Sequence, residues 1–545
     1  MCGILFSLSR NESSIDSNEW NQLLELNKKR GPDSQQLKTI HIDNFGLQFY
    51  STVLHLRGSN VVPQPIEESG NILCWNGEIF GGIYVEHGQN DTQVLMSHLA
   101  KADSQEDILS IFSRIEGPYA FVFWQAATKK LWFGRDCLGR RSLLIHRQSD
   151  LLLLSSVGLV NEAWEELAAN GIYCVDMTKE GPDNIQLFPW SQTDLPLLPF
   201  PRLNAALPQH LKTVDNPQIA PVLDEQQEEI VVDFIRVLSD SVKSRVADIP
   251  HLKHSHSARV AILFSGGIDC TVLAALADRF LPASEAIDLL NVAFENPRTT
   301  MAKNRTNKKK NQQEEQRPVY DTPDRITGRA SLEELKSIAP DRCWNFVEID
   351  VPYSEAMEYR QHIIDLMFPL DTVMDLSIAM AFWFASRGKG TILCDGKKQP
   401  YHSQARVLLS GLGADEQLGG YSRHREAFRH GSWERLIQET QLDVDRISTR
   451  NLGRDDRIMS DHGKEVRFPF LCTDVVKWLC NQPIHFKMDL RFERGIGEKL
   501  LLRQAAHKIG LLSTSKNWKR AIQFGAKTAK MTESSRSEKG QHKLT

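Results

Sequence analysis

Residues 259–270 read Arg-Val-Ala-Ile-Leu-Phe-Ser-Gly-Gly-Ile-Asp-Cys, and this stretch decides the fold of the C-terminal half of the chain. Its first part, Arg259–Phe264, is a short apolar run, which predicts a buried strand. The pattern after the two glycines is helical. One face of that helix carries the apolar residues Val272, Leu273, Leu276 and Phe280. A strand, a glycine turn and a helix in direct succession predict one unit of a parallel α/β sheet.

The same rhythm continues along the C-terminal half. Further candidates for buried strands are Leu289–Phe294, Gly390–Cys394 and Arg406–Leu409, and helical segments separate them. Strands that alternate with helices predict a parallel sheet. We therefore place an α/β domain at residues 236–528.

The loop Ser265-Gly266-Gly267-Ile268-Asp269 suits an anionic ligand. Glycines let backbone N–H groups approach a phosphate, and the N-terminus of the following helix favours negative charge. It is not a Walker A loop, because no Gly-Lys-Ser/Thr completes it. A glycine-rich turn that binds no ligand fits this loop equally well when the loop is taken alone.

The other end of the chain begins Met1-Cys2-Gly3-Ile4. Removal of Met1 would leave Cys2 with a thiol nucleophile and a free α-amine on one residue. That amine has an ordinary pKa near ~7.7–8.0, so it can take the thiol proton at neutral pH. For Met-Cys alone, a buried structural cysteine is the more common outcome.

The first ~160 residues are rich in short strands joined mostly by turns. Predicted strands are Cys2–Leu8, Phe45–Ser51, Asn71–Trp75, Tyr119–Gln125, Lys130–Arg135, Ser142–His146 and Leu151–Ser155, and predicted helices are Asn18–Asn27 and Asp91–Leu99. This pattern favours stacked antiparallel sheets flanked by helices, in a domain over residues 2–182. A proline-rich stretch without periodicity follows, so residues 183–235 are interpreted as a linker.

The bulk composition limits the function classes. The chain has 545 residues, too many for one core, and a net charge of −4, which gives no basic field for nucleic acid or an anionic membrane. Its longest apolar stretch, Ile378–Ala385, is too short to span a bilayer. Nine cysteines without a CxxC pair or a signal peptide indicate a reduced, cytoplasmic protein.

Two segments have the composition of disordered chain. Residues 297–317 are charged and basic at their centre, which predicts a disordered surface insertion rather than a nucleic-acid contact. The polar tail, residues 529–545, is expected to be unstructured for the same reason.

Asn76-Gly77-Glu78 follows a predicted strand and offers donors for an oxyanion, the Asn76 side-chain amide and the Gly77 N–H. Asn-Gly is more often just a turn. Asp91 stands at a helix start, where a carboxylate is usually a cap. It could instead hold the amino group of an amino-acid substrate.

The N-terminal motifs together resemble the class II glutamine amidotransferases. The resemblance rests on Met1-Cys2-Gly3-Ile4, Asn76-Gly77-Glu78-Ile79, Asp91-Thr92-Gln93 and the segment from Gly117 to Arg135-Asp136, in this order and spacing. It implies an N-terminal nucleophile fold, an αββα sandwich that hydrolyses glutamine to glutamate and ammonia. Cys2 would be the nucleophile, Asn76 and Gly77 the oxyanion hole, and Glu78 and Asp91 glutamine-binding residues. The family's carboxylate-binding Arg is displaced here to Arg57.

The C-terminal motifs resemble the asparagine synthetases. They are the loop at Ser265, Ser410-Gly411-Leu412-Gly413-Ala414-Asp415-Glu416, the segment His462–Leu471, Glu498-Lys499-Leu500, and Lys519 with Gln523-Phe524-Gly525. The resemblance implies an adenine-nucleotide α-hydrolase-like domain, an ATP pyrophosphatase, with ATP and Mg²⁺ as cofactors. Implied ATP contacts are Ser265, Gly266, Gly267, Asp269, Val292, Ser410 and Gly411. Asp269 and Asp415 would hold the metal, and Lys519 would be catalytic.

Two positions depart from that family. Cys270 stands where a Ser is usual and is a weaker donor. Leu412 stands where asparagine synthetases carry a catalytic Glu, and losing a general base costs a factor of ~10²–10⁴.

The leading hypothesis is ATP-driven amide synthesis with ammonia from glutamine and aspartate as the acceptor by family, giving asparagine, AMP and pyrophosphate. A different acid acceptor is the second hypothesis, which Leu412 and the displaced Arg57 favour. A non-catalytic binding or assembly protein is the third. The resemblance is also compatible with a homodimer.

Overall fold

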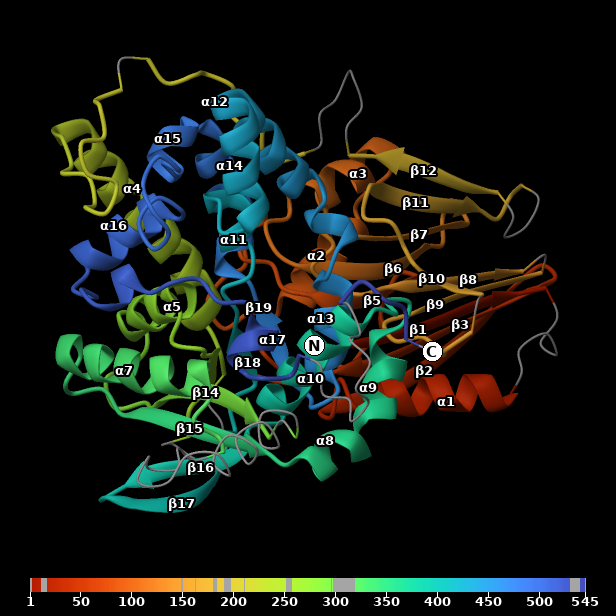
Figure 1. Cartoon of the computed structure of the whole chain (residues 1–545). Coiled ribbons are helices and arrows are strands. Elements are labelled where there is room, and N and C mark those ends of the chain that lie inside the picture. Colours follow the sequence, from red (N-terminus) through yellow and green to blue (C-terminus); the bar gives the residue numbers. More distant parts are fainter. Residues whose placement is uncertain are drawn as a thin grey trace.

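The computed structural model describes residues 2–10, 17–148, 150–161, 163–179, 184–190, 198–209, 211–250, 257–295, 297, 319–529 and 540–544. The protein is mixed α/β with three sheets, and its two halves lie side by side (Figure 1). The predicted insertion at 297–317 falls outside the described residues, apart from residue 297.

Two antiparallel six-stranded sheets build the N-terminal half. Sheet A runs in the order β10 (Trp164–Glu166), β8 (Leu144–Gln148), β9 (Leu151–Ser155), β1 (Gly3–Ser9), β3 (Phe45–Val53) and β2 (Ser34–Ile42). Sheet B runs in the order β12 (Ile185–Pro189), β11 (Gly171–Asp176), β7 (Lys130–Arg135), β6 (Tyr119–Gln125), β5 (Asn71–Gly77) and β4 (Ile66–Glu68).

Apolar side chains stack these elements into layers. One buried cluster joins the facing sides of the two sheets, for example Phe6 and Phe49 of sheet A with Val122 of sheet B. The outer face of sheet B packs on α2 (Asp91–Leu99) and α3 (Gln105–Arg114). The outer face of sheet A packs on α1 (Ser17–Lys28). The order of layers is therefore helix, sheet, sheet, helix.

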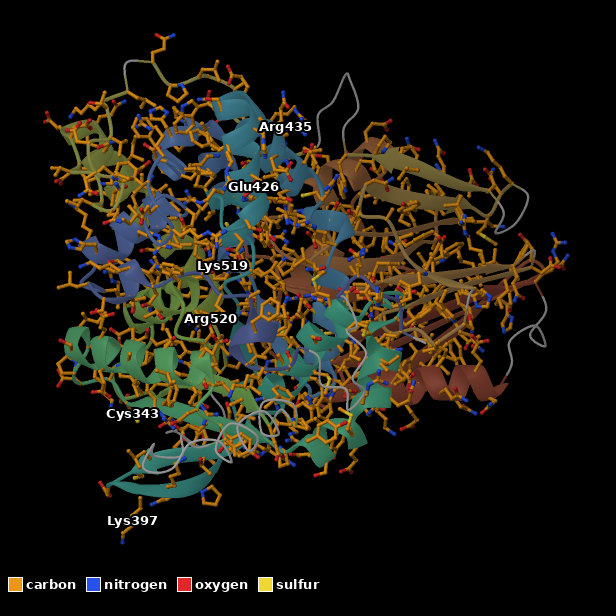
Figure 2. All side chains as sticks on the ribbon, viewed as in Figure 1. Cys343, Lys397, Glu426, Arg435, Lys519 and Arg520 are labelled. Atoms are coloured by element: carbon orange, nitrogen blue, oxygen red, sulfur yellow. The ribbon has the colours of Figure 1, made fainter. Side chains whose placement is uncertain are left out.

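A seven-stranded sheet C forms the centre of the C-terminal half. Its order is β17 (Lys397–His402), β16 (Lys389–Cys394), β15 (Trp344–Val351), β14 (Ile287–Phe294), β13 (Val260–Leu263), β18 (Val407–Leu409) and β19 (Glu465–Arg467). Five strands that are neighbours in this order pair in parallel, namely β15, β14, β13, β18 and β19. The prediction of a buried parallel strand at Gly390–Cys394 is wrong, because β16 and β17 form an exposed antiparallel hairpin with Lys397 at its tip (Figure 2).

Helices cover both faces of sheet C. One face carries α4 (Glu225–Val246), α5 (Ile268–Asp278), α7 (Pro323–Ile338), α14 (Thr473–Asn481) and α16 (Leu500–Lys508). The other carries α9 (Arg360–Met367), α10 (Val373–Arg387) and α13 (Leu452–Ser460). Smaller or peripheral helices are α8 (Tyr353–Glu358), α11 (Ala414–Leu418), α12 (Ser422–Asp445, broken at Gly431 and Ser432), α15 (Ile484–Lys487) and α17 (Ile522–Gly525). None of the described helices has the length and apolarity needed to cross a membrane.

Two expected boundaries differ from the structure. The segment 183–235, expected to be a linker, contains β12 and the first half of α4, whose apolar residues Val231 and Phe234 enter the core of the C-terminal half. The tail was expected to be unstructured, but its described residues 540–544 pair with the start of α10. The N–H of Val373 donates to His542 O, and the N–H of Leu544 donates to Asp371 O.

Buried ion pairs fix the two halves to each other. Arg30 Nη2 lies 2.7 Å from Asp456 Oδ2, and Arg141 Nη2 lies 3.0 Å from Glu465 Oε2. All four side chains are at most 2% exposed. A buried charge is tolerated only when it is paired, so these contacts require the halves to remain docked.

Candidate functional site

Cys2 precedes β1 and lines a small cavity, called the Cys2 cavity, together with Gln64, Gly77, Glu78, Asp91 and Glu465. Gln64 Nε2 lies 3.9 Å from Cys2 Sγ, and Arg30 Nε donates to the Cys2 carbonyl at 3.2 Å. Burial raises the pKa of the Cys2 thiol to about 11. The thiol is therefore protonated at neutral pH and needs a base before it can act as a nucleophile.

The predicted oxyanion donors lie at the end of β5. The side chain of Asn76 is completely buried, and neither its amide nitrogen nor its oxygen has a hydrogen-bond partner among the described residues. An orphaned buried amide is costly and is a sign of a functional role. Gly77 lines the Cys2 cavity, but Asn76 does not. A Cβ at Gly77 would meet the Tyr119 Cβ at 2.6 Å, so packing also requires this glycine.

Asp91 is buried at the start of α2 but does not cap it. Asn90 is the cap and accepts from the backbone N–H of Thr92 and Gln93, whereas Asp91 accepts from the N–H of Ile79 at 3.0 Å. Burial raises the pKa of Asp91. The capping interpretation of Asp91 is therefore wrong, and its carboxylate faces the Cys2 cavity.

The displaced Arg57 also lines the Cys2 cavity. Its Nη1 donates to Ile79 O at 2.8 Å and lies 3.8 Å from Glu78 Oε2. Burial raises the pKa of Glu78 to about 8, against the lowering effect of Arg467. The Arg57 guanidinium and the carboxyl groups of Glu78 and Asp91 thus line the same cavity as the thiol, which suits a zwitterionic amino acid.

One residue of this cavity and one residue that contacts its wall come from the C-terminal half, and no site role was predicted for either from the sequence. Glu465 lines the cavity, and Arg467 Nη2 lies 3.3 Å from Glu78 Oε1. Both belong to the three-residue strand β19. Charged residues on either side of Val466 were the available signal, but nothing local pointed to the other half of the chain.

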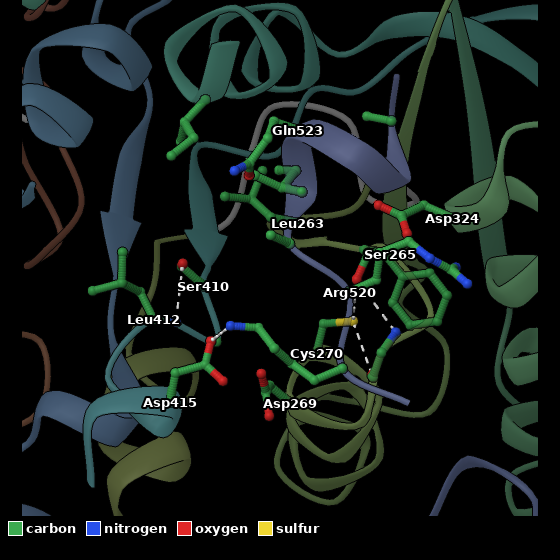
Figure 3. Close-up of a pocket in the computed structure, with 18 of the residues that line it drawn as sticks. Leu263, Ser265, Asp269, Cys270, Asp324, Ser410, Leu412, Asp415, Arg520 and Gln523 are labelled. Atoms are coloured by element: carbon green, nitrogen blue, oxygen red, sulfur yellow. Dashed lines mark hydrogen bonds and ion pairs between the residues drawn. The ribbon is translucent and has the colours of Figure 1, made fainter. Parts of the chain in front are cut away.

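The second cavity, called the Ser265 cavity, has a volume of about 270 Å³ and lies at the carboxyl ends of β13 and β18 (Figure 3). Gly266 has φ +76°, and a Cβ there would collide with the backbone at Gly328. Gly267 is the N-cap of α5, and its N–H donates to Ser265 Oγ at 3.3 Å. The helix N-terminus therefore faces the cavity and favours an anion.

Cys270 follows in the first turn of α5. Its Sγ donates to the Gly267 carbonyl at 3.2 Å, and Ser265 Oγ lies 3.7 Å away. Burial raises the pKa of this thiol, which stays neutral. Cys270 thus stabilises the loop as a weak donor.

The two predicted metal residues converge on one point (Figure 3). Lys499 Nζ lies 2.7 Å from both carboxylate oxygens of Asp269 and 2.7 Å from Asp415 Oδ1. Lys519 Nζ lies 2.7 Å from Asp415 Oδ2. Burial opposes ionisation, but these two lysines hold the pKa of Asp415 far below its usual range. No role was predicted for Lys499 from the sequence.

The donor set fits Mg²⁺ with help from a ligand. Two carboxylates that reach one ammonium nitrogen at 2.7 Å can also bridge one small cation. Within the described part of the chain, no group of three or more His, Cys, Asp or Glu side chains could hold a metal. Phosphate oxygens would therefore have to complete the coordination sphere of a Mg²⁺ ion held by Asp269 and Asp415.

The remaining predicted residues line the same cavity, namely Val292, Ser410, Gly411 and Leu412. A Cβ at Gly411 would lie 2.7 Å from the Asp269 Cβ, so glycine lets the two loops meet. Leu412 presents an apolar surface. The carboxyl groups that follow it in sequence on the cavity wall are Asp415 and Glu416. Burial, followed by the charge of Asp415, raises the pKa of Glu416, which accepts from the Tyr421 hydroxyl.

Asp324 of α7 is a further acidic residue of this cavity that the sequence did not reveal. It is 6% exposed, and burial raises its pKa to about 7, against the lowering effect of Arg520. A carboxyl group with such a pKa in a cavity is typical of a binding or catalytic site.

Comparison with known proteins matches a part of each half of the chain to a known domain family. Residues 236–437 and 428–538 match the asparagine synthase family, and residues 54–158 match a glutamine amidotransferase domain. Asparagine synthetase domain-containing protein 1 of Bos taurus is 41% identical over 97% of this chain and 96% of that protein. The Homo sapiens protein of the same name is 41% identical over 97% of this chain and 95% of that protein.

Among solved structures, glutamine phosphoribosylpyrophosphate amidotransferase from B. subtilis, complexed with ADP and GMP, has a TM-score of 0.25. It is 13% identical over 48% of this chain and 60% of that chain, a likeness too small to indicate a shared fold.

Proposed function

This chain belongs to the family of asparagine synthetase domain-containing protein 1, and from that premise we propose that it is an ATP-dependent amide ligase supplied with ammonia from glutamine. The N-terminal half would hydrolyse glutamine as an N-terminal nucleophile domain. The C-terminal half would activate a carboxylic acid as an acyl-adenylate with release of pyrophosphate. Ammonia would then displace AMP and form the amide.

Glutamine hydrolysis would use the groups of the Cys2 cavity. After removal of Met1, the α-amine of Cys2 takes the thiol proton, and the thiolate attacks the side-chain amide carbon of glutamine. The C–N bond then breaks, ammonia leaves with the proton that the amine returns, and water hydrolyses the thioester to glutamate and the free thiol. The Gly77 N–H stabilises the oxyanion, and the orphaned Asn76 amide, which does not line the cavity, would join it once the cavity wall moves. Asp91 and Arg57 hold the amino and carboxylate groups of glutamine.

The Cys2 cavity has a volume of only about 20 Å³, which accommodates about one water molecule. Glutamine binding therefore requires side chains of the cavity wall to move. Arg57, which Glu78 and the Ile79 carbonyl hold in place, is the residue whose release would admit the substrate carboxylate.

Acid activation would take place in the Ser265 cavity. The loop 265–267 and the N-terminus of α5 bind the phosphates, and Val292, Ser410 and Gly411 line the nucleotide. Mg²⁺, when bound by Asp269 and Asp415, neutralises phosphate charge. Lys519 stabilises the negative charge on the leaving pyrophosphate.

Two classes of carboxylic acid remain as candidates for the acceptor of the ammonia. Aspartate is the acceptor that the asparagine synthase family name implies. A different carboxylic acid is favoured by Leu412, an apolar residue on the cavity wall that cannot accept a proton from ammonia. Glu416 and Asp324, which line the same cavity, are the carboxyl groups outside the proposed metal site that could do so.

The observation that carries the proposal is the use of one strand by both cavities. Glu465 of β19 lines the Cys2 cavity, while the carbonyl of Arg467 accepts a hydrogen bond at 3.0 Å from the N–H of Ser410, which lines the Ser265 cavity. This arrangement suits a protein in which ammonia made on one side is consumed on the other.

The test is product analysis of processed protein with Mg²⁺-ATP and aspartate, first with ammonia and then with glutamine labelled with ¹⁵N in its side-chain amide. We expect asparagine, AMP and pyrophosphate in equal amounts, and the label in asparagine. AMP formation with another acid but not with aspartate would establish the second acceptor hypothesis. ATP binding without AMP formation from any acid would support a non-catalytic protein.

A further inference from the structure

Lys499 holds together two acidic side chains that come from distant parts of the chain. Its ammonium lies 2.7 Å from both oxygens of Asp269, at the start of α5, and 2.7 Å from Asp415 Oδ1, at the start of α11. The side chain of Lys499 is 1% exposed. Two carboxylates that converge in a buried place repel each other unless a cation lies between them, and here that cation is part of the protein.

The backbone conformation at Lys499 and around it places the Lys499 ammonium between the two carboxylates. Lys499 itself has φ +54°, an unfavourable conformation for a residue with a side chain. Its N–H donates to the Leu418 carbonyl at 2.8 Å, at the end of α11. A Cβ at Gly420 would collide with Asp415 and lie 2.7 Å from Lys499 Cε. Strain at Lys499 and a glycine at 420 thus both serve the close contact of Lys499 with Asp415.

Lys519, unlike Lys499, does not lie between the two carboxylates. It contacts Asp415 at 2.7 Å, no ion pair joins it to Asp269 in the described structure, and its side chain is 22% exposed. Lys519 can therefore turn toward a ligand without separating the two carboxylates. Lys499 cannot leave without doing so.

Resting on the proposed function, we propose that Lys499 is a positioning residue that occupies the place of the metal between Asp269 and Asp415 until a metal–phosphate complex arrives. An ammonium and a divalent cation compete for the same carboxylate oxygens. The free protein therefore binds Mg²⁺ weakly, and the metal enters with the triphosphate or stays with pyrophosphate. On arrival, the Lys499 ammonium shifts from the carboxylates to phosphate oxygens.

The experiment measures Mn²⁺ binding by electron paramagnetic resonance, using the full-length protein without ATP, glutamine or acceptor. We expect the wild-type protein to bind Mn²⁺ weakly alone and at least about tenfold more tightly with inorganic pyrophosphate, since phosphate oxygens complete the coordination sphere. We expect Lys499→Met to bind Mn²⁺ alone at least about tenfold more tightly than the wild type, since both oxygens of Asp269 and Oδ1 of Asp415 lose their ammonium partner, while Lys519 keeps Asp415 Oδ2.

Two further variants serve as controls. Lys464→Met removes another buried lysine, which donates to the Ser403 carbonyl at 3.0 Å outside the cavity, and should leave Mn²⁺ binding at the wild-type value. Lys499→Met with Asp269→Asn keeps the buried charge balanced, so it should fold even if the single variant does not. It should show no gain in Mn²⁺ affinity.

Tight Mn²⁺ binding by the wild-type protein without any phosphate, or unchanged affinity in a folded Lys499→Met variant, would overturn the inference. Neither readout needs turnover or an acceptor acid. If no amide forms with any acid but the Mn²⁺ results hold, the proposed function fails and the role of Lys499 stands.

Discussion

Arg467 Nη2 lies 3.3 Å from Glu78 Oε1, so a guanidinium from the C-terminal half completes the charge balance of a cavity in the N-terminal half. The same guanidinium pairs with Glu465 through Nε at 2.6 Å and donates through Nη1 to the Arg245 carbonyl at 2.7 Å. The backbone carbonyl of Arg467 accepts a hydrogen bond from the N–H of Ser410, which lines the Ser265 cavity. Arg467 thus contacts a residue of each cavity, and the Cys2 cavity needs Glu465 from the C-terminal half to complete its wall.

Replacing Arg467 by Met should destabilise the protein by up to roughly 3–5 kcal/mol, because Glu465 then keeps only Arg141 as a partner and Glu78 keeps only the more distant Arg57. Chemical unfolding would measure the loss. Above about pH 8, where Glu78 is ionised, Glu78→Gln in the same background should restore part of that stability, and a double-mutant cycle gives the coupling. Additive effects of the two changes would show that the ion pair is unimportant.

Cys2→Ala should abolish glutamine-dependent amide formation, by at least about 10³-fold, while ammonia-dependent formation stays within about twofold of the wild type. Cys343→Ser, a change at an exposed cysteine, is the matched control and should leave both activities unchanged. Equal loss of both activities in Cys2→Ala would mean that Cys2 has a structural role. The measurement is amide production from each nitrogen source under otherwise identical conditions.

Apolar runs allowed several elements to be predicted with correct bounds, among them β6, β7, β9 and α2. These segments are buried, so their pattern reflects the core directly. β2 was missed because Ser34–Ile42 is mostly half-exposed or exposed and rich in polar residues. β16 was misjudged because Gly390–Cys394 is apolar in sequence although its strand lies at the exposed side of sheet C.

Local sequence patterns also indicated only some of the residues in the two candidate sites. Short motifs that resemble those of known families made Cys2, Asp91, Asp269 and Asp415 candidates, and each of these residues lines one of the two cavities. Glu465, Arg467 and Lys499 reach their partners only through the tertiary fold, at sequence separations that no local pattern records. Asp324 follows the segment 298–318, which the structure does not describe, and nothing around it in sequence distinguishes it from a helix-start carboxylate.

Stability should depend on pH through Asp324. Burial raises its pKa from 3.8 to about 7, so the folded state holds a proton that the unfolded state releases. Its contribution to stability is full below about pH 3.8 and is lost as the pH rises to about 7. Asp324→Asn should remove this dependence and raise the stability at pH 8 relative to the wild type by up to about 4 kcal/mol. Thermal unfolding at pH 5 and pH 8 would measure it, with Asp341→Asn at the surface as a control.

Lys519→Met should slow AMP and pyrophosphate formation by about 10²–10³-fold, because an ammonium near the leaving phosphates stabilises charge that develops only in the transition state. Binding of ATP should change far less, since the loop 265–267 and the α5 N-terminus remain. Isothermal titration with ATP and a pyrophosphate-release assay separate the two effects. Lys516→Met, at an exposed lysine of the same segment that does not line the Ser265 cavity, should behave as the wild type. Equal losses in ATP affinity and in rate would instead assign Lys519 to ground-state binding, because an interaction present before the chemical step cannot accelerate it.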